Sequence, residues 1–148
     1  KYDKGIFVLA KTSNPSSGEL QDRKIDGKSV YEIMGEMCEK WGEQQIGTSG
    51  YSAVGAVVGA TYPEQLAELR AKLPHTMFLV PGYGAQGGGA KGVAGAFDAN
   101  GRGAIVNSSR AIMCAYQKEE NCPEEDFAKA ARREAIRMRD DIMAYLQK

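Results

Sequence analysis

Two short segments of the sequence contain the residue types that bind phosphate groups. Residues 81–89 (PGYGAQGGG) are rich in glycine, and residues 107–110 (NSSR) end in an arginine. Closely spaced glycines let the backbone curl, so that several N–H groups can point at one anion. The guanidinium of Arg110 is a planar fork that can bond two phosphate oxygens at once. Together the two segments predict a site that grips a phosphate group on a small-molecule ligand.

Each signal also has an ordinary structural explanation. Glycine-rich loops are common where a backbone merely turns, and Arg110 alone is as easily a surface ion pair as a ligand-binding residue. Gly82, Gly84 and Gly87 match the dinucleotide motif G-x-G-x-x-G, but each later glycine disfavours the helix that this motif requires by about 1 kcal/mol. The segment is not a P-loop either, because it has no Gly-Lys-Ser/Thr ending. We therefore expect residues 82–103 to form a functional loop without a helix.

Both segments follow short apolar runs that predict strands. The runs are residues 6–10 (IFVLA), 53–60 (AVGAVVGA), 77–80 (MFLV) and 104–106 (AIV). Continuous apolar runs are typical of strands that are buried on both faces of a parallel sheet. In such folds ligands gather at the carboxyl ends of the strands, so the residues directly after each run are the candidates for a site.

Helical patterns separate the predicted strands. Residues 29–32 (SVYE) have the capping-box form S-x-x-E, and apolar residues recur at helical spacing as far as Trp41. A second helix is expected to start at residues 61–64 (TYPE), and a last one to run from about Pro123 to the end of the chain. Strands that alternate with helices predict an α/β fold with right-handed crossovers, as a single domain over residues 1–148.

Composition narrows the class of partner. Nineteen basic and nineteen acidic side chains cancel and are scattered, so we expect neither a nucleic-acid nor a membrane partner. Cys38, Cys114 and Cys122 are odd in number and have no paired spacing, which indicates neither a disulfide framework nor a zinc site. No apolar stretch approaches the roughly 20 residues of a membrane span. These features favour a soluble protein of the reducing cytoplasm.

A few other polar residues lie near the predicted strand ends. Ser13 and Asn14 could bind a ligand, although Ser-Asn-Pro is also an ordinary turn sequence. Gln86 is an amide within the glycine loop that can donate and accept hydrogen bonds, unless it only faces solvent. His75 has no evident Ser or Cys nucleophile as a partner, so a hydrolytic triad is not predicted.

The strand-end motifs resemble those of orotidine 5'-phosphate decarboxylase of the bacterial type-two subgroup. The motifs are residues 12–16 (TSNPS) with Gln21, 57–63 (VVGATYP), 79–88 (LVPGYGAQGG) and 108–110 (SSR). The resemblance covers nearly the whole chain, and the P-G-x-G-x-Q-G-G loop is a specific signature. It implies that this chain is the C-terminal half of a TIM (β/α)8 barrel and a piece of a longer protein. The four strands of this chain would be strands five to eight of that barrel.

The resemblance also implies a role for each site residue. Ser13 would bond the amide edge of the pyrimidine, Pro81 would line the base pocket, and Gln86 would bridge the base and the phosphate. Arg110 would hold the phosphate dianion. Backbone N–H groups would complete the phosphate cradle near four residues: Gly87, Gly88, Ser109 and Arg110.

The implied reaction is the decarboxylation of orotidine 5'-phosphate to UMP in pyrimidine biosynthesis, without a metal or an organic cofactor. In the family, a lysine amid aspartates protonates the carbanion that forms when carbon dioxide leaves. These residues lie in the second and third strands, which would precede Lys1. We therefore predict that this chain contains no catalytic residue. Lys11 lies near the expected face but in a different motif, so we do not assign it as the proton donor. The resemblance further implies a homodimer.

A second hypothesis needs no chemistry from the chain. Four parallel strands with a phosphate site could form a stand-alone module that binds a phosphorylated ligand. A half barrel would leave two apolar strands as open edges, which is an aggregation hazard. An isolated chain that behaves as a stable monomer would favour the binding module.

Overall fold

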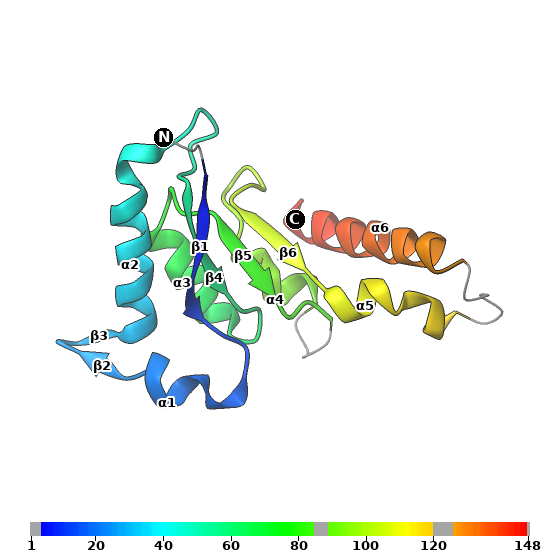
Figure 1. The fold of residues 1–148 in the computed structure, drawn as a ribbon, viewed down its shortest axis with the longest axis horizontal. Coiled ribbons are helices and arrows are strands. Elements are labelled where there is room, and N and C mark those ends of the chain that lie inside the picture. The colour runs from blue at the N-terminus through cyan, green and yellow to red at the C-terminus, as the bar shows by residue number, and fades with distance from the viewer. Residues whose placement is uncertain (1–3, 85–88, 120–125, 148) are drawn as a thin grey trace.

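The computed structural model describes residues 4–84, 89–119 and 126–147. Its centre is a parallel sheet with the strand order β1-β4-β5-β6 (Figure 1). The strands are β1 (Ile6–Lys11), β4 (Val54–Val58), β5 (Phe78–Pro81) and β6 (Ala104–Asn107). Each strand overlaps the apolar run that predicted it. The predicted α/β class with a parallel sheet is therefore confirmed.

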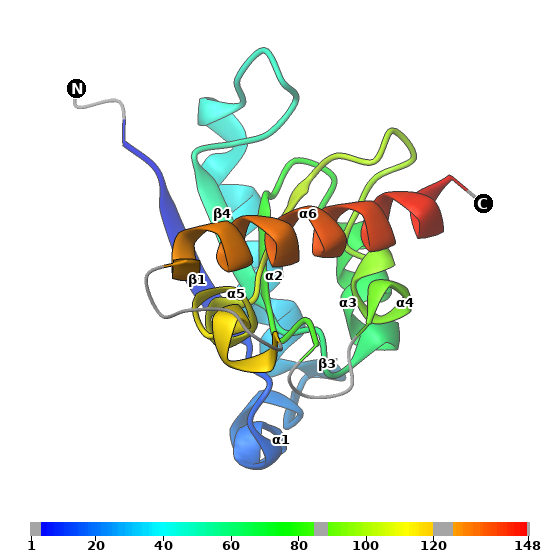
Figure 2. The same cartoon turned by 90° about the vertical axis from the view of Figure 1, so that its right-hand side faces the viewer.

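Three longer helices accompany the sheet: α2 (Val30–Gly42), α3 (Pro63–Lys72) and α6 (Phe127–Leu146). Helix α2 packs against β1 and β4, whereas α6 lies beyond β6, at the other end of the row of strands (Figure 1). Figure 2 shows α3 and the short helix α4 (Ala90–Ala94) side by side, and α6 contacts α4. The predicted helices after residues 29 and 62 are confirmed. The expected start of the last helix at Pro123 lies outside the described residues.

Short elements connect these units. They are η1 (Pro15–Ser17), α1 (Gly18–Gln21), β2 (Lys24–Ile25), β3 (Lys28–Ser29), η2 (Glu43–Gln45), α5 (Ser109–Met113) and η3 (Ala115–Lys118). Strands β2 and β3 form an antiparallel hairpin. Its turn, Asp26–Gly27, has positive φ at both residues, as a type I′ turn requires, and this Asp-Gly signal was missed in the sequence. No helix in the described part of the chain is long and apolar enough to cross a membrane.

The expectation that residues 82–103 lack a helix is wrong. Helix α4 forms there despite Gly92, because Ala90 and Val93 are buried in the core. The end of α4 also approaches α3 closely, since a Cβ on Gly95 would lie 3.0 Å from the Cβ of Ala67. Burial and close packing thus outweigh the low helix propensity of glycine at this position.

One face of the sheet is only partly covered. Paired residues of the four strands form an apolar row across this face: Leu9, Val57, Leu79 and Ile105. In the edge strands, Leu9 is 58% exposed and Ile105 is 51% exposed. The prediction that the first strand is buried on both faces is therefore wrong for this chain. In a complete barrel this face would be the interior, and residues from other strands would cover it.

The opposite face packs against the helices, and Arg70 of α3 joins this layer to the amino ends of β5 and β6. Its guanidinium is buried and donates hydrogen bonds to the carbonyl oxygens of Thr76 (2.9 Å), Gly103 (3.2 Å) and Leu73. It also lies over the ring of Phe78, 4.3 Å from the ring centroid. One side chain thus fixes the helix-to-strand turn and the register of two strands.

Replacing Arg70 with alanine should destabilise the protein by about 3 kcal/mol, because the substitution leaves several buried carbonyl groups without a donor. Urea denaturation of the full-length protein would measure the loss. Arg102→Ala is the matched control, because Arg102 is exposed in the turn before β6, and it should cost less than about 0.5 kcal/mol. Equal losses for the two variants would contradict this role of Arg70.

Helix α2 begins with the predicted capping box. The backbone N–H of Ser29 donates to the Glu32 carboxylate at 2.8 Å, and Lys72 of α3 forms an ion pair with the same carboxylate. The hydrogen bond from Lys72, together with that from Ser29, lowers the pKa of Glu32 to about 2. The cap therefore ties the start of α2 to the end of α3.

This lowered pKa predicts a pH-dependent contribution to stability. Because the folded-state pKa lies below the ordinary value of 4.5, the ionised cap stabilises the fold above about pH 4.5 and loses its effect as the pH falls toward 2. Glu32→Gln should therefore lower the melting temperature at pH 7, and the difference from wild type should shrink near pH 2. The control is Glu36→Gln, which removes the exposed Lys28–Glu36 ion pair. A difference for Glu32→Gln that does not change with pH would refute the assignment.

Candidate functional site

An open cavity of about 310 Å³ lies at the carboxyl ends of the strands. Its described lining comes from all four strands and from the segments that follow β1, β5 and β6: Leu9, Thr12, Ser13, Val57, Pro81, Gly82, Tyr83, Asn107, Ser108, Ser109, Arg110 and Ala111. This is the edge at which ligands bind in parallel α/β folds. The structure thus brings together Ser13, Pro81, Ser109 and Arg110 as predicted. The other predicted residues, Gln86, Gly87 and Gly88, lie outside the described residues.

The hydroxyl of Ser13 occupies a niche beside two glycine backbones. A Cβ on Gly59 would lie 2.1 Å from Ser13 Oγ, and a Cβ on Gly82 would lie 3.3 Å from it. Gly82 also has a φ of +104°, which side-chain-bearing residues rarely adopt. The glycines in two of the strand-end motifs therefore leave the space that Ser13 fills. The contribution of Gly59 was not predicted from the sequence.

Two buried polar atoms at the cavity have no hydrogen-bond partner among the described residues. They are Ser13 Oγ and Asn107 Oδ1. Buried polar groups in native proteins are nearly always paired, so two such atoms in residues that line one cavity indicate a polar ligand. The sequence placed Asn107 in the NSSR segment but gave it no role, and the structure adds it to the site.

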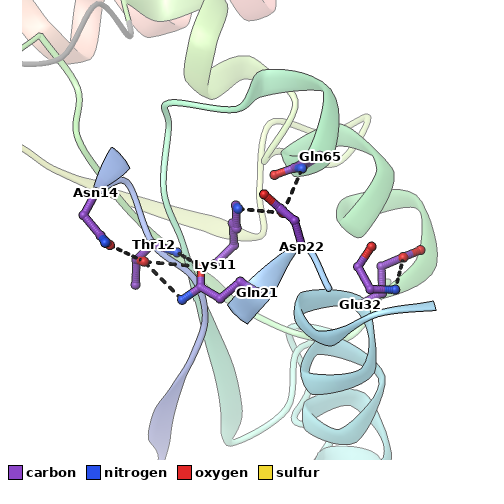
Figure 3. Close-up of polar contacts among 8 residues, drawn as sticks. Lys11, Thr12, Asn14, Gln21, Asp22, Glu32 and Gln65 are labelled. Atoms are coloured by element: carbon purple, nitrogen blue, oxygen red, sulfur yellow. Dashed lines mark hydrogen bonds and ion pairs between the residues drawn. The ribbon is translucent and has the colours of Figure 1, made fainter. Parts of the chain in front are cut away.

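The segment that carries Ser13 is closed by a pair of side-chain contacts. The Thr12 backbone N–H donates to Gln21 Oε1 at 2.9 Å, and Gln21 Nε2 donates to Thr12 Oγ1 at 3.1 Å (Figure 3). Gln21 ends helix α1, so this contact joins the end of β1 to the end of α1. The distant Gln21 of the TSNPS motif thus orients the strand end and does not line the cavity.

Tyr83 joins the two segments that were predicted to bind phosphate. It lies between Gly82 and Gly84, which both have positive φ, and its carbonyl accepts a hydrogen bond from Ser108 Oγ at 2.8 Å. Its phenol group donates to Asp141 of α6 at 2.5 Å. Burial, followed by this hydrogen bond, raises the pKa of Tyr83 to about 12. Sequence reasoning missed Tyr83, because only its neighbouring glycines marked the position.

Arg110 provides the charge at the site. Helix α5 begins at Ser109, and both Ser109 and Arg110 are exposed. Within the described part of the chain, Arg110 is the one charged residue that lines the cavity. Lys11 is not among the lining residues, because a bulge after Leu9 changes the register of β1. The site is therefore suited to an anion.

The described lining residues can bind a ligand but include no evident proton donor or base. None of those residues is Lys, His, Asp or Glu, which are common groups for proton transfer. Tyr83 is among them, but its phenol group donates to Asp141 of α6. In residues 4–84, 89–119 and 126–147, no three His, Cys, Asp or Glu side chains gather in a way that could hold a metal ion. The described geometry thus supports the recognition of an anion and of a further polar group.

Comparison with known proteins shows where this arrangement recurs. The model of the orotidine 5'-phosphate decarboxylase / HUMPS family matches residues 1–124. An orotidine 5'-phosphate decarboxylase from Rhodopirellula baltica is 50% identical over 141 residues, which are 93% of this chain and 47% of that protein. One from Clostridium perfringens strain SM101 is 48% identical, over 96% of this chain and 49% of that protein. The chain spans about half the length of the curated relatives it matches.

Solved structures agree with the sequence matches. A protein from Toxoplasma gondii, assigned as an orotidine-monophosphate decarboxylase, superposes with a TM-score of 0.76 at 28% identity, over 99% of this chain and 53% of that one. The OMP decarboxylase of Leishmania donovani gives a TM-score of 0.68 at 32% identity, over 95% and 49%. The half-barrel fold that the resemblance implied is confirmed. By sequence and by fold, this chain belongs to the orotidine 5'-phosphate decarboxylase / HUMPS family.

Proposed function

We propose that this chain supplies the phosphate- and pyrimidine-binding half of an orotidine 5'-phosphate decarboxylase. The complete protein would release carbon dioxide from orotidine 5'-phosphate and form UMP. One observation carries the proposal: Arg110 shares a cavity at the strand ends with Ser13 Oγ and Asn107 Oδ1, two buried polar atoms that lack a partner among the described residues. The cavity offers a cation for the phosphate and unsatisfied polar groups for the rest of the nucleotide.

The phosphate end of the site would be formed after β6 and within the glycine loop. The Arg110 guanidinium can bond two phosphate oxygens, and the first-turn N–H groups of α5 at Ser109 and Arg110 have no partners within that helix. Gln86, Gly87 and Gly88 would contribute the glycine-loop side of the cradle. The hydrogen bond from Ser108 to the Tyr83 carbonyl supports this arrangement, because it holds the two segments together.

The pyrimidine end would lie near β1. Ser13 Oγ is able both to donate and to accept, which suits the amide edge of a pyrimidine, where a donor and an acceptor lie side by side. Pro81 lines the same cavity and offers an apolar surface to the ring. Binding energy from the phosphate and the base, both remote from the bond that breaks, can lower the barrier to decarboxylation if it is realised in the transition state.

Proton transfer would come from outside this chain. The described lining contains one charged side chain, that of Arg110, and a guanidinium group is a poor proton donor. We therefore propose that a lysine amid aspartates, elsewhere in the complete protein, protonates the carbanion after carbon dioxide leaves. No cofactor is required in this scheme. The lack of any other charged side chain in the described lining also favours the second candidate, a phosphate-ligand binding module without catalysis.

Assembly and location remain proposals that other features support. A homodimer with its site near the subunit interface follows from the family resemblance. A cytoplasmic location is supported by the cysteines of the described chain, because Cys38 and Cys114 form no disulfide.

In the full-length protein, Arg110→Ala should lower kcat/KM for orotidine 5'-phosphate by on the order of 100-fold, because the phosphate loses a charge-assisted fork. The same variant should change kcat/KM for the nucleoside orotidine, which has no phosphate, by less than about threefold. Arg102→Ala is the matched control, because Arg102 precedes the same strand that Arg110 follows and lies at its opposite end. An unchanged value for the nucleotide would remove Arg110 from the phosphate site.

The 148-residue chain alone should not release carbon dioxide from orotidine 5'-phosphate above the uncatalysed rate, because the proton donor lies elsewhere. Release of labelled carbon dioxide would be measured beside the full-length protein at equal concentration. Turnover by the 148-residue chain would place the proton donor within it. Absence of turnover in the full-length protein as well would favour the binding module.

A further inference from the structure

A lysine is fully buried directly before the residues that line the cavity. Lys11 ends β1, is 0% exposed, and is among the largest fully buried side chains of the described core. Taking an ammonium group out of water costs several kcal/mol unless partners compensate it. Lys11 does not line the cavity, so its burial needs an explanation other than contact with the ligand.

Its partners come from three separate parts of the chain. Lys11 Nζ lies 2.7 Å from Asp22 Oδ1 (Figure 3). It also lies 4.5 Å from the ring centroid of Tyr62 and 5.7 Å from that of Tyr31. The same Asp22 oxygen accepts a hydrogen bond from Gln65 of α3 at 3.3 Å. Asp22 is therefore held from the end of β1 and from α3, and two aromatic rings stabilise the cation.

This ion pair is one of two adjacent contacts that close residues 11–22. Lys11 pairs with Asp22, and the next residue inward at each end forms the second contact, between Thr12 and Gln21. Gly18 leaves room for the first contact, because a Cβ there would lie 2.8 Å from Asp22 Oδ2. Both ends of the segment are thus fixed relative to each other.

Ser13 is the next residue after this double contact. Its hydroxyl lies in the niche beside Gly59 and Gly82, and the Gly59 backbone N–H donates to the Lys11 carbonyl at 2.8 Å. Lys11 therefore contacts one wall of the niche through its backbone and fixes the segment that carries Ser13 through its side chain. A shift at Asp22 would reach Ser13 through Gln21 and Thr12.

We propose that Lys11 is a positioning residue, which holds Asp22 and the 12–22 segment so that Ser13 keeps its place at the base end of the site. The nature of the ligand rests on the proposed function, whereas the hold on the segment does not. Lys11 would act without touching the nucleotide. The grip on the phosphate, built after β5 and β6, would be independent of it.

A double-mutant cycle in the full-length protein tests whether Lys11 acts through Ser13. Lys11→Met keeps the length of the side chain, and Asp22 is 40% exposed, so its carboxylate can remain hydrated. We expect Lys11→Met to lower kcat/KM for orotidine 5'-phosphate about tenfold, but less than about threefold when Ser13→Ala is already present. Additive effects, or no effect of Ser13→Ala itself, would overturn the proposal.

Ligand binding separates positioning from general destabilisation. Lys11→Met should weaken the binding of UMP about tenfold and leave that of ribose 5-phosphate unchanged, because only UMP has a base. Equal weakening of both ligands would mean a merely structural role and would overturn the proposal. Asp22→Glu is the second variant, since it keeps both charges but lengthens the pair by one methylene, and it should show the same selectivity. Lys28→Met, which removes an exposed ion pair, should change neither ligand.

Amide hydrogen exchange tests the hold on the segment without any ligand. Lys11→Met should accelerate exchange in residues 12–22 about tenfold relative to wild type, and Lys28→Met should not. Unchanged exchange in Lys11→Met would overturn the proposal whatever the kinetics show. If exchange is accelerated in Lys11→Met but the wild-type protein binds no nucleotide, the hold by Lys11 is supported and the proposed function is refuted.

Discussion

Parallel pairing of the four strands is the constraint on which the rest of the structure depends. Because β1, β4, β5 and β6 run in one direction, their carboxyl ends meet at one edge, although Ser13 and Asn107 are 94 positions apart in the sequence. The register joins Pro81 to Asn107 directly. Short segments after β1, β5 and β6 therefore form one cavity, although they lie far apart in the sequence. At the amino ends of β5 and β6, Arg70 fixes the same register through its hydrogen bonds to the carbonyl oxygens of Thr76 and Gly103.

The same pairing leaves an apolar face of the sheet partly exposed. The row from Leu9 to Ile105 crosses all four strands, and its two end residues lie in edge strands and are more than half exposed. An isolated parallel sheet rarely tolerates such a face, because parallel strands are normally covered on both sides. The half-barrel fold and the half-length match to the relatives account for this exposure together. The face that carries the cavity is thus also the face that other strands would cover.

Sequence reasoning recovered the features that depend on local pattern. The apolar runs gave the four strands, and the S-x-x-E motif gave the start of α2 at Val30. Position after a strand was enough to bring Ser13, Pro81, Ser109 and Arg110 to one cavity. The helix α4 was missed because Ala90 and Val93 gain burial that no local propensity contains. Asn107 was missed because only the structure shows that its side-chain oxygen is buried without a partner among the described residues. Gly59 was missed because its importance lies in its distance to Ser13, which follows another strand.

Lys11 shows why the sequence does not reveal which strand-end residues face the cavity. Its place at the end of a strand resembles that of a cavity residue, and only the bulge between Leu9 and Lys11 directs it elsewhere. A bulge shifts the alternation of side chains by one position, so an error of a single residue reverses the predicted face. Tyr83 is similar, since two glycines with positive φ direct its ring to α6 while its backbone stays at the cavity. Around this site, small backbone irregularities decide which polar side chains meet the ligand and which hold the scaffold.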